Sequence, residues 1–242
     1  MINNYDSAET CLLKGSANSK KQESTSFTGK KGPLVSFMTV FLMLFSFVFV
    51  QGQTTLISPT GDGGFENGAT FAANGWQTVN PATDTWQVGN VPVSSNGANC
   101  AYVSANGGAA WTYSQISVFN HVYRDVTIPA GENKVTLSFK WKVGGEGTTT
   151  SDWDNMKVFW SPTSFTPSST AAVTGATQLS GPGAVSGMYK LSSASWNTET
   201  IVFSATPGTY RLIFQWKSDG LDIANPPAAL DEISLVSQAP GV

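Results

Sequence analysis

Two stretches of the chain alternate apolar and polar residues in nearly the same way. In VTLSFKWKVGGEG, residues 135–147, and in YRLIFQWKSDG, residues 210–220, every second side chain is apolar up to the Trp-Lys pair, with Ile213 as the one exception. A two-residue period predicts a strand with one face on a core and the other in water. We therefore predict two central strands that bury Val135, Leu137, Phe139, Trp141, Tyr210, Leu212, Phe214 and Trp216. A duplicated module is the alternative, but no second shared segment follows at the same offset.

Similar runs recur along the rest of the chain, separated by Gly, Pro, Asn and Asp. Together with the two stretches above, they predict strands over 85–90, 100–105, 110–116, 121–128, 133–143, 155–161, 198–205, 208–218 and 228–237. About nine or ten strands at this spacing are typical of an all-β protein with two packed antiparallel sheets. Residues 161–187 are uncharged and rich in Ser, Thr, Gly and Pro. We expect a mobile surface excursion there, with a binding loop as the alternative.

The N-terminal segment has the pattern of a secretory signal. Lys30 and Lys31 precede an apolar run over 34–50, and small residues before Gln53 offer a cleavage site. We therefore interpret residues 1–52 as a signal peptide with an extended N-terminal region. An uncleaved membrane anchor is the alternative, because this 17-residue run, interrupted only by Ser36, Thr39 and Ser46, reaches about 25 Å, the short limit for a bilayer.

Charge and cysteine content narrow the possible functions. From Gln53 onward eight Lys and Arg stand against thirteen Asp and Glu, so this part carries a formal charge of −5. A mildly acidic chain without a basic cluster argues against nucleic-acid binding, which requires phosphate neutralisation. Cleavage before Gln53 leaves Cys100 as the one cysteine, so the domain cannot form an internal disulfide and must depend on its core. We interpret Cys100 as a buried apolar residue, with a reactive thiol as the alternative.

The residues that catalysis requires are sparse after Gln53. His121 has no Ser or Cys motif near it, and no nucleophile elbow, phosphate-binding loop or His/Cys metal motif occurs. Glu146, Asp152 and Asp154 offer the carboxylates that a glycosidase needs, but acids beside a Gly-rich turn are common turn chemistry. We therefore expect no enzyme.

Acidic residues near both ends of the domain suggest a metal site. Asp62 and Glu66 lie at its start, and Asp231 and Glu232 at its end. In many sandwiches the first and last strands are neighbours, which would bring Glu66 near Asp231. Calcium prefers such oxygen ligands, so we predict a structural calcium held by Glu66 and Asp231. The alternative is that these are ordinary surface acids in caps and turns.

Three segments, in this order, resemble one family of bacterial domains. They are GGFENGATFAANGWQTVN with DTWQVGN, then VTLSFKWKVGGEG with DWDNMKVFW, then TYRLIFQWKSDG with NPPAALDEISL. Over about 63–236 they resemble cleaved-adhesin and choice-of-anchor J domains. The resemblance implies a MAM-like jelly-roll β-sandwich in secreted or cell-surface bacterial proteins, often exported by the type IX system and associated with adhesion. It also implies a structural calcium near the positions matched by Glu66 and Asp231. The Asp-rich calcium loops of some relatives are not evident.

We accordingly expect a lead-in over 53–62, a jelly-roll domain over 63–237 and the start of a linker over 238–242. The expected function is a secreted or cell-surface, non-catalytic adhesion or interaction domain, the N-terminal part of a larger surface protein, with an extracellular glycan or protein as ligand. After signal cleavage we expect no membrane insertion. The alternative is a carbohydrate-binding module attached to a polysaccharide-degrading enzyme. Sugars stack on exposed rings, and Trp153 and Trp196 are the tryptophans that we expect on the surface as ligand-binding residues.

Overall fold

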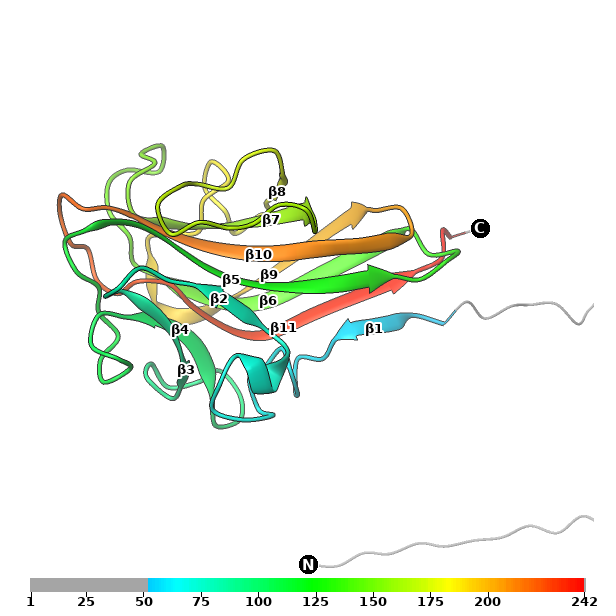
Figure 1. Ribbon diagram of the computed structural model, residues 1–242, viewed down its shortest axis with the longest axis horizontal. Coiled ribbons are helices and arrows are strands. Elements are labelled where there is room, and N and C mark those ends of the chain that lie inside the picture. Colours follow the sequence, from blue (N-terminus) through cyan, green and yellow to red (C-terminus); the bar gives the residue numbers. More distant parts are fainter. Residues whose placement is uncertain (1–51, 242) are drawn as a thin grey trace, which may run out of the picture. The chain divides into compact units, whose positions relative to one another are not determined.

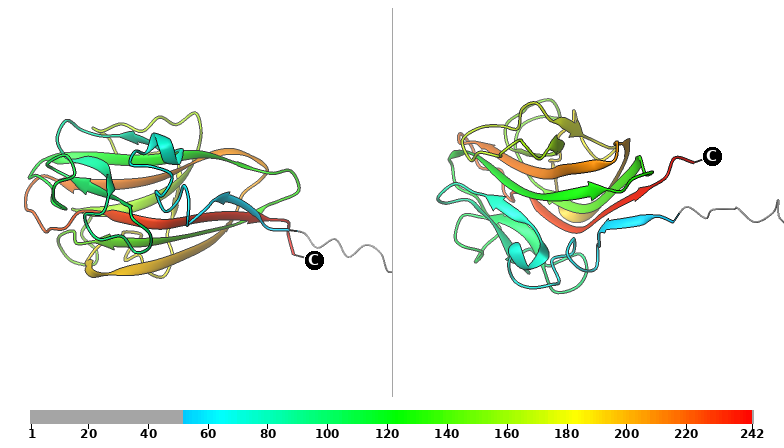
Figure 2. Two further views of the ribbon diagram at one scale, coloured as in Figure 1. Left: turned by 90° about the horizontal axis from the view of Figure 1, so that it is seen from below. Right: turned by 45° about the vertical axis from the view of Figure 1, so that its right-hand side comes forward.

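The alternating segments form strands of two antiparallel sheets, which Figures 1 and 2 show as two stacked layers. The computed structural model describes residues 52–241, so the predicted signal peptide lies almost wholly outside the described residues. The strands are β1 Thr54–Ile57, β2 Gln77–Val79, β3 Thr85–Gly89, β4 Cys100–Ser104, β5 Ser117–Ile128, β6 Lys134–Val143, β7 Asn155–Pro162, β8 Thr177–Leu179, β9 Ser192–Ser204, β10 Gly208–Asp219 and β11 Ala229–Gln238. A 3₁₀ turn, η1, covers Ala72–Asn74. Within 52–241 no helix has the length and apolar character to cross a membrane.

The strand order confirms the predicted fold class, an all-β jelly-roll sandwich. One sheet has the order β3-β4-β11-β6-β9, with β1 also paired to β11, and the other has the order β2-β5-β10-β7-β8. The first strand, β1, which was not predicted, is a neighbour of the last strand, since Thr54 pairs with Ser237. Residues 53–62, expected to form a lead-in, contain the strand β1. Its last residue, Ile57, is fully buried in the core.

Aromatic side chains of β6 and β10 join the two sheets. Phe139 and Phe214 lie 5.2 Å apart in an edge-to-face contact, and both are buried. Trp141 and Trp216, two residues further along each strand, are also buried. The prediction that the two repeated segments supply the core is therefore confirmed for these four residues, each of which contributes about 2 kcal/mol or more by leaving water.

The one irregular position of the second segment, Ile213, is buried on the opposite face. It contacts a second apolar cluster outside the five-stranded sheet, together with Tyr123, Phe159 and Val173. Phe165 packs against the same cluster, so the stretch after β7 covers the outer face of this sheet. The expected mobile excursion over 161–187 is therefore wrong for this part, because Ile213 and its neighbours give the segment an apolar surface to bury.

A polar clamp holds this covering segment in place. The side-chain oxygen of Gln215 accepts a hydrogen bond from the Val173 backbone N–H, at 2.9 Å, and lies 3.3 Å from Nε2 of His121. Both side chains are buried. Burial lowers the pKa of His121 to about 4, so the imidazole is neutral at physiological pH.

The strand predicted over 110–116 does not form. The backbone N–H of Tyr113 donates to the side chain of Asn225, at 3.2 Å, and that of Ser114 donates to the Asp84 carboxylate, at 2.9 Å. Side chains far along the sequence thus take the hydrogen bonds that a neighbouring strand would need. The short strands β2 and β8 were not predicted, because three residues carry too little periodicity.

The burial of neutral His121 predicts an acid-sensitive fold. Its pKa is about 4 when folded and 6.5 in an unfolded chain, so between these values the unfolded state binds more protons. The free energy of unfolding should therefore decrease as the pH falls from 6.5 to 4, by about 3 kcal/mol from this residue. Urea unfolding across this range measures the loss. In His121→Gln the decrease should be smaller, and identical pH profiles for both proteins would contradict this account.

Candidate functional site

Three loops meet at one end of the sandwich, at the left in Figure 1. The backbone N–H of Gly144 donates to the Pro226 carbonyl, at 2.8 Å, and that of Leu191 donates to the Gly144 carbonyl, at 2.5 Å. These bonds hold together residues 144–154, 190–191 and 219–226, which we call the loop end.

A buried carboxylate, Asp154, fixes the geometry of the loop end. Its Oδ2 accepts a hydrogen bond from the Tyr113 hydroxyl, and its Oδ1 accepts one from the Asp219 backbone N–H, at 2.9 Å. The Tyr113 hydroxyl also accepts a hydrogen bond from the Ala224 N–H, at 2.8 Å. Burial raises the pKa of Asp154, whereas these donors favour its ionised form. One side chain therefore links the start of β7, the end of β10 and the loop before β11.

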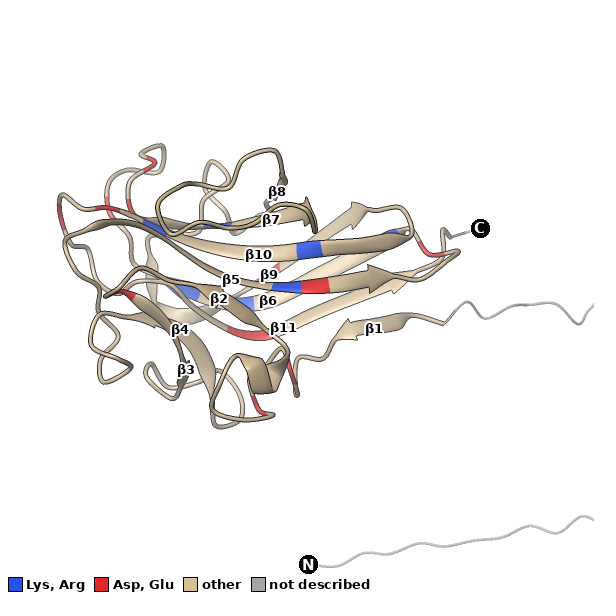
Figure 3. Ribbon diagram, viewed as in Figure 1, with Lys and Arg blue, Asp and Glu red and all other residues tan. Residues whose placement is uncertain are grey.

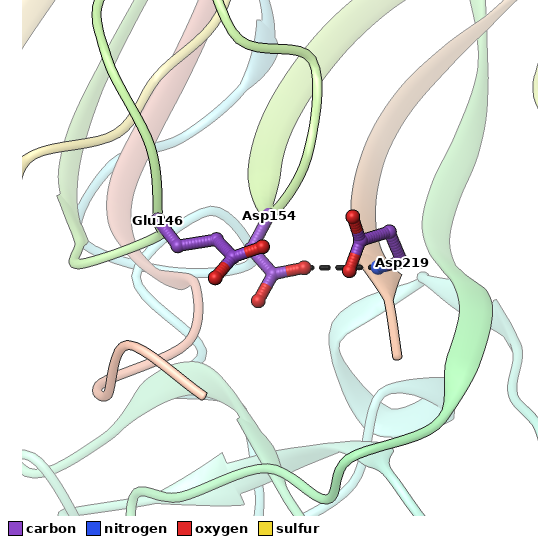
Figure 4. A group of neighbouring side chains, drawn as sticks. All are labelled: Glu146, Asp154 and Asp219. Carbon is purple, nitrogen blue, oxygen red and sulfur yellow. Dashed lines mark hydrogen bonds between the residues drawn. The ribbon is translucent and has the colours of Figure 1, made fainter. Parts of the chain in front are cut away.

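Two further carboxylates lie beside Asp154. Figure 4 shows Glu146, from the loop after β6, and Asp219, the last residue of β10, directed toward it. One oxygen of each of the three lies within 4.8 Å of the others. Partial burial, then the charges of Asp154, Asp219 and Asp222, raise the pKa of Glu146. Sequence analysis missed Asp219, although Glu146 and Asp219 are each the next-to-last residue of a repeated segment, and β6 and β10 both end at the loop end.

Two of the three carboxylates considered for glycosidase chemistry, Asp152 and Asp154, are paired or buried. Asp152 forms ion pairs with Lys157, at 2.9 Å, and Lys217, at 3.5 Å, and does not join the group. Asp154 is fully buried and already accepts two hydrogen bonds. A general acid must reach the glycosidic oxygen, which this burial prevents. His121 is equally inaccessible, because it is buried in the clamp with Gln215.

Exposed apolar side chains gather on the loop end. Seven large apolar side chains are exposed in the described part of the chain, and four of them lie on these three loops: Trp153, Leu191, Leu221 and Ile223. Trp153 is 47% exposed, as predicted, and its ring lies against Gly147, where a Cβ would collide with it. Such a concentration is typical of an interaction surface, since single exposed apolar residues are ordinarily scattered.

Trp196, the second predicted ligand-binding residue, lies elsewhere. It packs with Trp111 on the outer face of the six-stranded sheet, and the Lys142 ammonium lies 4.9 Å from the Trp196 ring centroid and 5.9 Å from that of Trp111. Its Nε1–H donates to the Val93 carbonyl, at 3.0 Å. Trp196 is therefore partly buried and bonded to a loop, so it offers less free ring surface than Trp153.

Glu66 and Asp231, the predicted calcium ligands, bind the same loop. Asp231 Oδ2 accepts hydrogen bonds from the backbone N–H groups of Ser95, at 2.7 Å, and Asn96, at 3.3 Å. Glu66 Oε1 accepts them from residues 98 and 99, at 2.9 and 2.8 Å. Burial raises the pKa of Asp231 to about 6. Both carboxylates already have backbone donors as partners, and within 52–241 they belong to no group of three metal-ligating side chains. Calcium at this pair stays a prediction.

Asp62 and Cys100, which the sequence analysis also singled out, make contacts that stabilise the fold. Asp62 forms an ion pair with Arg124, at 2.5 Å. Cys100 is buried, and its thiol donates to the Pro92 carbonyl, at 3.2 Å. Burial raises the pKa of the thiol, which keeps it protonated and unreactive. Figure 3 shows that acidic positions mark the loops at the left-hand end of the sandwich, so negative charge concentrates where the apolar side chains are exposed.

Comparison with known proteins gives structural likenesses alone. No family model matches the sequence, and no curated protein matches it. The CBM22-1 xylan-binding domain of Paenibacillus barcinonensis Xyn10C superimposes with a TM-score of 0.47 and 15% identity, over 79% of this chain and 99% of that one. The K1 cleaved adhesin domain of Lys-gingipain from Porphyromonas gingivalis W83 superimposes with a TM-score of 0.40 and 18% identity, over 78% of this chain and 99% of that one. At these values the likenesses assign neither a family nor a ligand, and the choice-of-anchor J resemblance stays a prediction.

The hydrogen bonds of Asp231 predict a measurable contribution to stability. Asp231→Ala would leave the N–H groups of Ser95 and Asn96 without their acceptor, which costs about 1–3 kcal/mol for the partly buried Ser95 and less for Asn96, which water can reach. Because the substitution also removes a carboxylate that burial disfavours, we expect the free energy of unfolding at pH 7 to fall by about 1–2 kcal/mol in urea titrations. Asp222→Ala, which removes an exposed carboxylate, serves as the control and should change it by less than about 0.5 kcal/mol. Equal effects of the two substitutions would refute the anchoring role.

Proposed function

We propose that this chain is a non-catalytic recognition domain that acts outside the cell and adheres to an extracellular ligand through the loop end. The observation that carries the proposal is the concentration of Trp153, Leu191, Leu221 and Ile223 on three adjoining loops of a rigid sandwich. Binding residues are commonly placed on loops that a rigid scaffold positions. The signal-like pattern before Gln53 supports export, because its positive, apolar and small-residue regions follow in the order of a secretory signal.

The non-catalytic part of the proposal rests on the chemistry of the described side chains. The groups suited to acid–base or nucleophilic work are buried or paired: His121 with Gln215, Asp152 with two lysines, and Cys100 as a protonated thiol. Perturbed groups at enzyme sites ordinarily face a cleft that the substrate enters. Here His121 and Cys100 are buried and Asp152 is paired with lysines, which favours binding over turnover.

A carbohydrate ligand is the second candidate, and the exposure of Trp153 favours it. Sugar rings stack on exposed aromatic faces, and an acidic side chain nearby accepts hydrogen bonds from sugar hydroxyls. Trp153 is half exposed and immediately precedes Asp154 in the sequence, and Glu146 is part of the same loop. Trp196, on the outer face of the six-stranded sheet, exposes a smaller aromatic surface.

Binding assays with matched variants test the proposal. The full chain, immobilised and exposed to arrays of glycans and of extracellular matrix proteins, should bind a ligand in a saturable way. Trp153→Ala and Leu221→Ser should each weaken that binding about tenfold, because interface anchors contribute 1 kcal/mol or more. Val202→Ala, an exposed apolar position on β9, should leave it unchanged.

The pattern of losses separates the two candidates. A glycan ligand lost in Trp153→Ala favours carbohydrate recognition, and a protein ligand lost in both variants favours adhesion to protein. Saturable binding that survives both loop-end substitutions would show that the ligand site lies elsewhere. Turnover of polysaccharide or ester substrates would show that the chain is an enzyme.

A further inference from the structure

The exposed apolar surface of the loop end is mostly aliphatic. Of its exposed apolar side chains Trp153 alone carries a ring, and the others are Leu191, Leu221 and Ile223. Sugars stack on aromatic faces and present hydroxyl groups, so aliphatic side chains add little to a carbohydrate site. The fully buried centre of a protein–protein interface, by contrast, is rich in apolar contacts. The composition of this surface therefore favours a protein as the ligand.

The same surface is negatively charged. The loop end contains one Lys, Lys190, against five acidic residues, Glu146, Asp152, Asp154, Asp219 and Asp222, so its formal charge is −4. Lys157 and Lys217 lie beside it and both pair with Asp152, and counting these two lysines leaves −2. The acidic groups therefore outnumber every cation that this end of the sandwich supplies.

The pKa of Glu146 reports the sign of the local field. It is raised by partial burial and then by the charges of three other carboxylates, those of Asp154, Asp219 and Asp222. The ammonium group of Lys190 acts in the opposite direction, but its effect is smaller than that of any of the three. The charge of Lys190 thus does not cancel the negative field at the loop end.

One carboxylate lies among the exposed apolar side chains themselves. Asp222 stands between Leu221 and Ile223 in the sequence, and all three are exposed. Among residues 52–241 it forms no ion pair. A ligand that covers the two apolar neighbours also takes water away from this carboxylate. That costs free energy unless a cationic group of the ligand replaces the water.

This combination of charge and apolar area selects the partner. A second copy of the chain, an acidic glycan or an anionic membrane would bring like charges together, which is unfavourable. The guanidinium group of Arg and the ammonium group of Lys form strong, charge-assisted hydrogen bonds with carboxylates. A polypeptide can present such groups beside apolar side chains, so it matches both properties of the surface.

We propose that the loop end binds a basic, apolar segment of another protein, in which Lys or Arg side chains flank an apolar anchor. The inference rests on the proposed function, because it names the partner of the same surface. The anchor packs against Trp153 and Leu221, and the basic side chains pair with Asp222 and Glu146. Because Trp153 lies against Gly147 and the loops are bonded to one another, the surface is formed before the ligand arrives.

An array of short random peptides tests the chemistry of the partner, with the labelled full chain as the probe. The peptides belong to separate classes: apolar and basic, apolar and acidic, apolar and uncharged, and polar and basic. The apolar and basic class should bind most strongly. Fluorescence polarisation then gives the dissociation constant of its best peptide. This constant should rise about tenfold from about 0.1 M to about 1 M salt, because the screening length falls from about 10 to about 3 Å.

Substitutions of Asp222 test the charge at a position that supports no other contact, since this exposed side chain forms no ion pair in the described chain. Asp222→Asn should weaken the binding of the best peptide about fivefold at low salt and reduce its salt dependence. Asp222→Lys should shift the preference toward the apolar and acidic class. Asp125→Asn, which removes a carboxylate paired with Arg211 on β5, is the matched control and should bind as the wild type does. Circular dichroism verifies that each variant is folded.

The outcomes separate a failure of this inference from a failure of the proposed function. Equal binding of the apolar and basic and the apolar and acidic classes, or no binding of any peptide, would overturn the inference. If a glycan or an uncharged peptide binds instead and is lost in Trp153→Ala, the loop end remains the ligand site and only the basic partner is wrong. Peptide binding that survives both Trp153→Ala and Leu221→Ser would show that the proposed site itself is wrong.

Discussion

The aromatic contact between the two sheets is the constraint on which the rest of the structure depends. Phe139 and Phe214 lie at equivalent places in two strands with nearly the same sequence pattern, and their rings meet edge to face between the layers. Trp76 and Tyr189 extend the contact to either side. Within the described chain Cys100 is free, so no disulfide supports the sandwich and its stability comes from this buried surface. The repeated sequence pattern therefore reflects one packing problem solved in two facing strands.

The same core positions the loop end. The Trp216 ring packs edge to face against Tyr113, with centroids 5.2 Å apart, and the Tyr113 hydroxyl binds the buried Asp154 carboxylate and the Ala224 N–H. Apolar packing thus continues into a short polar network, and that network orients the acidic and apolar side chains at the surface. Because a buried carboxylate needs every one of its donors, the loops have little freedom to rearrange. A rigid end of this kind is suited to recognition.

Local patterns in the sequence were enough to predict the architecture but not the site. The alternation in β6 and β10 identified the core, because a two-residue period directly reports which face is buried. The segment over 110–116 also alternates, yet its N–H groups bond to the side chains of Asp84 and Asn225, which no local pattern shows. The packing of the segment after β7 over Ile213 was not predicted either, because no local pattern shows which distant residues it contacts. Exposure of Trp153 was predicted from its turn, whereas the meeting of Glu146 with Asp219 depends on the direction of strands in two different sheets.

The link between the core and the loop end is tested most directly by hydrogen exchange in Tyr113→Phe. This substitution keeps the ring against Trp216 and removes only the hydroxyl that binds Asp154 and Ala224. Tyr102→Phe, which removes a hydroxyl bonded to the Gly108 carbonyl, is the matched control. We predict that amide exchange over 219–226 and 144–154 becomes faster in Tyr113→Phe alone, while β5, β6 and β10 keep their protection. Unchanged exchange over these loops, or an equal loss of protection throughout the sandwich, would contradict the account.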